Sequence, residues 1–150
     1  MPREIASFSN ATVKQLRALR DKKARRAEGL FLAEARDSGR LPEIIAFSSE
    51  GAKHPLAMAI VAEAEAAGAD AIHTRDDILT KVTGKDNAPL LLGAFRQPAT
   101  GLTDLDRSAS DLWLVAQALR DPGNIGTMLR TGDAVGAGGL ILIDDCADPF

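Results

Sequence analysis

The stretch LWLVAQALRDPGNIGTMLRTGDAVGAGGLILI, from Leu112 to Ile143, contains two apolar runs separated by a glycine-rich turn and a helix-like segment. The first run, residues 112–119, is continuous and typical of a buried parallel strand, and residues 139–143 form the second. Between the runs, a helix is expected from about Asn124 to Val135. The stretch therefore predicts one βαβ unit.

The turn DPGNIG at the start of this helix has the composition of an anion site. Gly123 and Gly126 permit positive φ or the close approach of a ligand, and Asn124 is a candidate N-cap beside free N–H groups. Arg130 follows six residues later and can fold back toward the same edge of the sheet, because helical side chains lean N-terminally. An ordinary strand-to-helix turn with a solvated arginine remains open. The spacing fits neither a dinucleotide-binding turn nor a P-loop.

Short apolar runs alternate with helix-like segments in the first part of the chain. The expected strands are residues 30–33, 43–49, 70–74 and 89–95, and the expected helices between them are residues 54–69 and 75–84. This alternation predicts an α/β fold with both faces of the sheet covered. Residues 97–110 lack periodicity and are rich in Pro, Gly, Ser, Thr and Asp, as linkers are. We expect a first domain over 1–96, a linker over 97–110 and the βαβ portion over 111–150.

A basic helix is expected near the amino terminus. Ser9 or Asn10 is a candidate N-cap, and Gly29 is expected to end the segment. Val13, Leu16 and Leu19 form an apolar stripe at helical spacing, and cations cover the rest: Lys14, Arg17, Arg20, Lys22, Lys23, Arg25 and Arg26. The net charge is −3, yet residues 1–30 hold eight Lys/Arg against three Asp/Glu. A solvated helix face and a phosphate-binding surface are both open interpretations of this cluster.

The composition excludes several other classes. Apolar residues at 45% and charged residues at 26% indicate a globular chain, and no secretory signal or membrane span is expected. A single cysteine, Cys146, excludes an internal disulfide, and His54 and His73 lack metal-ligand spacing, so we expect no metal. Both histidines are expected to be ordinary surface or satisfied residues. With aromatics at 4% and no Tyr, the composition gives little support for base-stacking platforms.

Residues 118–150, ALRDPGNIGTMLRTGDAVGAGGLILIDDCADPF, closely resemble the first conserved motif of the SpoU (TrmH-like) family of SPOUT RNA ribose 2'-O-methyltransferases. The shared features are the Asp-Pro-Gly-Asn-x-Gly-x-x-x-Arg-Thr core, the following strand and the Cys-x-Asp-Pro-Phe segment. Residues 9–35 resemble the opening of that family's substrate-binding domain, and the matching positions are Asn10, Val13, Lys14, Leu16, Phe31 and Glu34. Ala35 stands where the family commonly has glycine.

The resemblance implies a small ribosomal-protein-like α/β RNA-binding domain, followed by the first βαβ portion of a SPOUT trefoil-knot domain without its knot segment. It implies methyl transfer from S-adenosylmethionine to a ribose 2'-hydroxyl of rRNA or tRNA. Arg130 would be catalytic, Asn124 would orient the arginine or the substrate, and Gly126 would leave room for the RNA. The seven cations of the basic helix would contact RNA phosphates.

The resemblance also carries expectations about the rest of the protein. Cofactor-binding residues are expected beyond Phe150, so the 150-residue chain alone is expected to be inactive. The intact enzyme is expected to be a cytoplasmic homodimer. Two alternatives remain open: a non-catalytic RNA-binding module with a docked βαβ remnant, and a small phosphate-ligand enzyme that uses the glycine turn.

Overall fold

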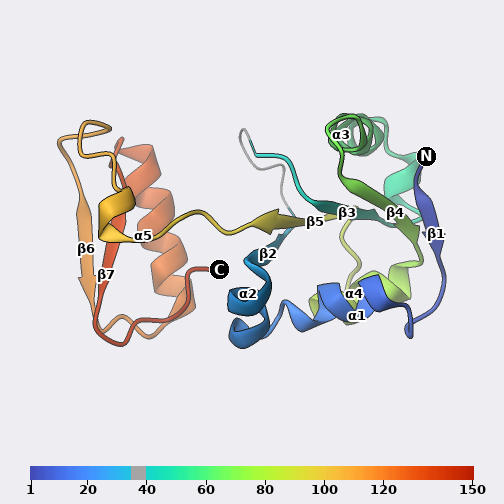
Figure 1. The fold of residues 1–150 in the computed structure, drawn as a ribbon, viewed down its shortest axis with the longest axis horizontal. Helices are drawn as coiled ribbons and strands as arrows, with labels where there is room; N and C mark the ends of the chain where they lie inside the picture. The colour runs from blue at the N-terminus through green and yellow to red at the C-terminus, as the bar shows by residue number, and fades with distance from the viewer. Residues whose placement is uncertain (35–39) are drawn as a thin grey trace. The chain divides into compact units, whose positions relative to one another are not determined.

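The computed structural model describes residues 1–34 and 40–150, which form two compact units, Met1–Gln97 and Pro98–Phe150 (Figure 1). The first unit contains β1 (Arg3–Ile5), α1 (Ala11–Ala18), α2 (Lys22–Glu28), β2 (Leu30–Ala33), β3 (Ile44–Phe47), η1 (Gly51–Lys53), α3 (Pro55–Ala66), β4 (Asp70–Thr74), α4 (Asp76–Thr83) and β5 (Leu91–Arg96). The second contains η2 (Leu102–Asp104), β6 (Leu114–Gln117), α5 (Pro122–Ala134) and β7 (Leu140–Ile143). Ala35 lies outside the described residues.

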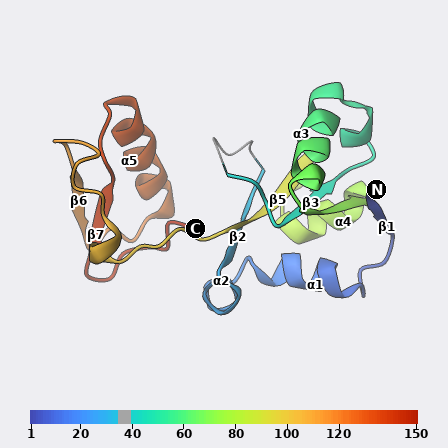
Figure 2. The same ribbon diagram turned by 45° about the horizontal axis from the view of Figure 1, so that its top comes forward.

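The first unit is built on a five-stranded mixed sheet in the order β1-β4-β3-β5-β2. The side chains of β3 alternate between its faces: Ile44 and Ala46 belong to one core cluster with α1 and α4, and Ile45 and Phe47 belong to another with α3. In both views α3 lies on one side of the sheet, and α1 and α4 lie on the other (Figures 1 and 2). The predicted α/β layers with both faces covered are confirmed for this unit.

Strand β1 is an element that the sequence pattern missed. Residues 3–5 pair in parallel with β4, and the Thr74 hydroxyl donates to the carbonyl of Ile5 over 2.6 Å. Only Ile5 of the strand is buried. A three-residue edge strand with two charged side chains has no apolar periodicity by which to recognise it.

The basic segment forms two helices where one was expected. Asn10 caps α1, which ends at Ala18 with Leu19 as its C-cap. The Asp21 carboxylate then accepts the N–H of Lys23 (2.8 Å) and starts α2. Gly29 takes the left-handed conformation (φ 66°) and ends α2, as predicted. The cations therefore lie on two short helices that change direction between them.

The second unit is the predicted βαβ: β6 and β7 pair in parallel, with α5 between them in the chain. The helix lies close against β6, because a Cβ added at Gly132 would come within 2.8 Å of Leu114 Cδ1. The Trp113 ring covers Gly138 in the same way, and its indole N–H donates to the carbonyl of Ser110 (2.9 Å). Glycine at these positions permits close packing.

The expected burial of the first strand is wrong. Regular pairing covers only Leu114–Gln117, Ala116 alone is buried, and Val115 is 57% exposed. A strand is buried on both faces only where layers cover both, and among the described residues of this unit α5 covers one face. None of the described helices in either unit has the length and apolar character needed to cross a membrane.

Candidate functional site

The turn between β6 and α5 is held by Asp121. Its carboxylate accepts the N–H of Gly123 over 2.7 Å and caps the helix, which begins at Pro122. The expectation that Asn124 is the N-cap is therefore wrong, because aspartate followed by proline is a stronger start signal three residues earlier. Asn124 lies in the first turn of α5 and is exposed.

The glycines of the turn also differ from expectation. Gly123 and Gly126 are both helical and neither uses a positive φ. The left-handed position is Ala118, directly after β6, with φ 52°. The chain therefore bends sharply at Ala118, before the glycines. Gly123 and Gly126 leave the first helical turns without side chains at their positions.

Arg130 folds back along α5 toward the helix start. A Cβ placed on Gly126 would lie 3.6 Å from Arg130 Nη1, and Arg130 Nη2 donates to the hydroxyl of Thr127 over 3.4 Å. The Thr127 hydroxyl in turn donates to the carbonyl of Gly123 (3.0 Å). The guanidinium thus lies along the first turns of the helix, in the direction that helical side chains favour.

The charge of Arg130 is uncompensated within the described part of the chain, where no carboxylate forms an ion pair with it. The neighbouring Arg120 differs, since it pairs with Asp145 over 3.5 Å. An exposed, unpaired guanidinium is able to bind a phosphate or an oxyanion without first breaking an ion pair.

The loop after β7 braces this edge of the parallel pair. Gln117 Nε2 donates to Asp144 Oδ2 (2.6 Å), and the backbone N–H of Ala147 donates to the carbonyl of Leu119 (2.8 Å). The Sγ of Cys146 accepts the N–H of Leu119 over 3.3 Å. Cys146 is thus a half-buried part of the loop packing, and the loop and the turn before α5 are tied together at the carboxyl ends of both strands.

The predicted RNA-binding cations of the first unit lie on α1, α2 and the turn between them. Six are exposed: Lys14, Arg17, Arg20, Lys22, Lys23 and Arg26. Arg25 is the exception, with 9% of its surface exposed. Its Nη1 donates to the carbonyls of Leu19 (3.1 Å) and Arg20 (2.8 Å), so its guanidinium holds the end of α1 against α2. Burial therefore corrects the expectation that Arg25 faces RNA.

These six cations differ from other cations of the same unit in that they form no ion pair with a described carboxylate. Among the described residues, none of the six pairs with a carboxylate. Five Lys or Arg side chains elsewhere in the described part of the unit are paired: Arg3 with Asp70, Lys53 with Glu50, Arg75 with Asp77, Lys85 with Glu34, and Arg96 with Glu43. Hydrogen bonding to Asp70 raises the pKa of Arg3 above its ordinary value. The surface of α1 and α2 therefore keeps positive charge that no carboxylate in the described ranges pairs with.

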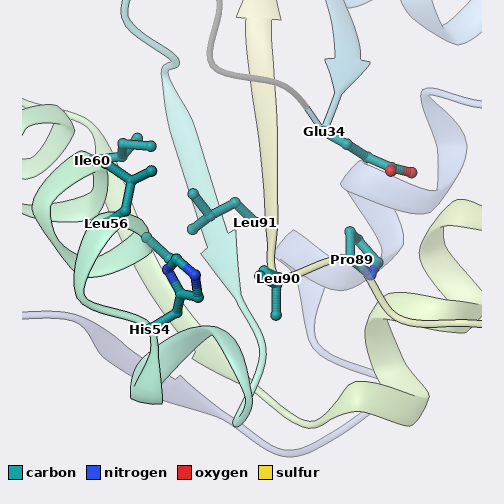
Figure 3. A pocket seen from close by; sticks show the side chains of 8 residues that line it. Glu34, His54, Leu56, Ile60, Pro89, Leu90 and Leu91 are labelled. Atoms are coloured by element: carbon teal, nitrogen blue, oxygen red, sulfur yellow. The ribbon is translucent and has the colours of Figure 1, made fainter.

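A separate cleft of about 260 Å³ lies in the first unit (Figure 3). Leu56 and Ile60 of α3 line it opposite Leu90 and Leu91, and His54 stands at its edge. No sequence pattern indicated this cleft, because its walls come from segments far apart in the chain. Its walls are mainly apolar, and the one carboxylate that lines it, Glu34, is engaged by Lys85.

The second histidine is packed within the protein. The His73 ring stacks on Phe47 with a centroid separation of 5.0 Å, and its Nδ1 lies 2.5 Å from Glu4 Oε1. Within the ranges that the structure describes, no group of three or more His, Cys, Asp or Glu side chains is arranged to hold a metal ion.

Comparison with known proteins defines the class. Residues 10–93 match the MRM3-like substrate binding domain. The chain is 31% identical to an uncharacterized tRNA/rRNA methyltransferase from Synechocystis, over 97% of this chain and 54% of that protein. It is 27% identical to the 23S rRNA guanosine 2'-O-methyltransferase RlmP from Bacillus subtilis, over 99% of this chain and 57% of that protein.

A solved structure matches the chain in fold as well as in sequence. The AdoMet-bound rRNA methyltransferase from Sinorhizobium meliloti superimposes with a TM-score of 0.85 at 30% identity, over 99% of this chain and 57% of that one. The fold is therefore that of a substrate-binding domain followed by part of a SPOUT domain. The chain belongs to the family with an MRM3-like substrate binding domain, among the SpoU (TrmH-like) RNA methyltransferases. It spans about half the length of the curated relatives that it matches.

Proposed function

We propose that the protein containing this chain transfers a methyl group from S-adenosylmethionine to a ribose 2'-hydroxyl of rRNA or tRNA. The observation that carries the proposal is the guanidinium of Arg130, which lies against Gly126 and Thr127 in α5 and pairs with no carboxylate among the described residues. The named 2'-O-methyltransferase activity of the Bacillus relative supports the same chemistry.

Arg130 acts on the ribose hydroxyl through its charge. A guanidinium stays protonated at neutral pH and is a poor proton acceptor, but as a cation it lowers the pKa of a nearby hydroxyl and binds the adjacent phosphate. Asn124 lies in the first turn of the same helix, exposed and able to donate and accept hydrogen bonds to the nucleotide. These two side chains hold the nucleotide and stabilise the developing negative charge on its oxygen.

None of the described residues is assigned to bind the methyl donor. S-adenosylmethionine supplies the methyl group in the proposed reaction, and the four residues of the Asp-Pro-Gly-Asn turn are exposed. We therefore assign no described residue as a cofactor ligand, and we expect those residues to lie beyond Phe150.

The predicted first domain, residues 1–96, binds the RNA in this proposal, and residues 97–110 link it to the methyltransferase portion in 111–150. Exposed cations on α1 and α2 contact phosphates and position the RNA, with Lys14, Arg17 and Arg20 on one side of the Asp21 cap and Lys22, Lys23 and Arg26 on the other. The intact enzyme is proposed to be cytoplasmic and homodimeric.

The reaction product tests the proposal. The full-length protein is incubated with RNA and a methyl-labelled donor, and the RNA is digested to nucleosides. Label in 2'-O-methylnucleosides supports the proposal. Label in a methylated base, or no transfer to either rRNA or tRNA, contradicts it, and RNA binding without transfer favours a non-catalytic binding module.

A further inference from the structure

The turn before α1 holds an aromatic side chain out toward solvent. Phe8 is 44% exposed, in a turn closed by the N–H of Asn10, which donates to the carbonyl of Ser7 over 3.2 Å. The hydroxyls of Ser7 and Ser9 hydrogen bond across its base (2.8 Å). The ring is therefore presented by a hydrogen-bonded turn that is continuous with the Asn10 cap of α1.

A cation from another element stands over this ring. Lys81 of α4 places its Nζ 5.3 Å from the ring centroid of Phe8. Helices α1 and α4 lie on the same side of the sheet in both views, and Leu16 and Val82 share one core cluster (Figures 1 and 2). Phe8 and Lys81 thus extend the basic surface of α1 onto α4.

Lys81 resembles the α1 cations in its lack of an acidic partner. Among the described residues no carboxylate pairs with Lys81, whereas Arg75 at the start of the same helix pairs with Asp77. The surface around Phe8 therefore combines cations that no described carboxylate pairs with one half-exposed aromatic ring, the combination that single-stranded nucleic-acid sites use.

We propose that Phe8 stacks against an unpaired nucleobase of the RNA while Lys81 and the cations of α1 hold the flanking phosphates. RNA fits this surface better than a protein partner does, because an apolar protein interface would leave several unpaired cations desolvated. The inference rests on the proposed RNA binding of the first unit. It also revises the sequence expectation, since a low aromatic content does not prevent a single ring from lying where a base would stack.

RNA affinity of the full-length protein tests the inference, with oligouridylate as the single strand and the same strand annealed to oligoadenylate as the duplex. Phe8→Ala is expected to weaken single-strand binding roughly 10-fold, with duplex binding and the salt dependence unchanged. Phe8→Trp is expected to restore it. Leu56→Ala is a matched control, since Leu56 is a similarly exposed apolar side chain on α3, across the sheet.

The results distinguish failure of the proposed RNA binding from failure of the proposed base stacking by Phe8. If the wild-type protein binds neither RNA, the proposed RNA-binding function of the first unit fails. If it binds the single strand and Phe8→Ala binds equally well, the stacking inference alone is overturned. A loss in Phe8→Ala that Phe8→Trp does not restore, or an equal loss for the duplex, also overturns it, because either result reflects a structural effect of the ring.

Discussion

The guanidinium of Arg130 lies over Gly126, one helical turn closer to the start of α5, with 3.6 Å between Arg130 Nη1 and the position that a Cβ at Gly126 would occupy. This distance allows ordinary contact with a methyl group, and a longer side chain would extend into the space that the guanidinium occupies. The lack of a side chain at Gly126 therefore leaves the space that the Arg130 guanidinium occupies.

The effect of a substitution at Gly126 is expected to depend on the size of the new side chain. Gly126→Ala fits beneath the guanidinium and stabilises the helix by up to about 1 kcal/mol, because alanine has the higher helix propensity. Gly126→Leu displaces the Arg130 side chain and is expected to lower methyl transfer at least about 10-fold. Thermal unfolding and transfer rates measure the two effects. Equal activity in both variants would show that the position of the guanidinium over Gly126 is irrelevant to transfer.

Thr127 is expected to position Arg130. Its hydroxyl accepts from Arg130 Nη2 and donates to the Gly123 carbonyl, so Thr127→Val removes both hydrogen bonds with little change in volume. We expect kcat to fall roughly two- to tenfold with KM for RNA nearly unchanged. Thr127→Ser keeps the hydroxyl and is expected to keep kcat. A fall in both variants would indicate a packing role instead.

Two adjacent arginines of α2 are expected to behave in opposite ways. Arg25→Met leaves the carbonyls of Leu19 and Arg20 without their donor and is expected to lower the free energy of unfolding by about 1–3 kcal/mol. Arg26→Met, at an exposed position, is expected to change it by less than about 0.5 kcal/mol. Chemical denaturation measures both variants, and equal losses would contradict the buried role of Arg25.

The exposed cations of α2 are expected to set the salt dependence of RNA binding. Replacing Lys22, Lys23 and Arg26 together by glutamine is expected to reduce the slope of log affinity against log salt by about 0.7 for each RNA phosphate that the variant no longer neutralises. The control is Lys53→Gln, which removes a cation already paired with Glu50. An unchanged slope in the triple variant would make these residues a solvated helix face.

The elements with strong local signals could be predicted from the sequence. The apolar runs at 30–33 and 70–74 are the strands β2 and β4 to the residue, and Gly29 ends a helix as its position indicated. The βαβ unit and its arginine followed from two apolar runs around a glycine-rich turn. Short-range patterns such as these are visible in the sequence because neighbouring residues create them.

The features that depend on distant residues could not be predicted. Asp21 splits the basic segment by capping a new helix, and Arg25 then becomes buried against carbonyls that the break exposes. The cation over Phe8 comes from α4, more than 70 residues along the chain. Spacing along the chain does not reveal which cation pairs, which is buried and which stays free.

The central claim is that Arg130 activates and holds the ribose hydroxyl. Its most direct test is the rate of methyl transfer to RNA by full-length Arg130→Ala and Arg130→Lys, with circular dichroism and RNA affinity measured on the same preparations. We predict that both variants fold and bind RNA while transfer falls by at least about 100-fold in Arg130→Ala, with only partial activity in Arg130→Lys. Near-normal turnover in both variants would contradict the account.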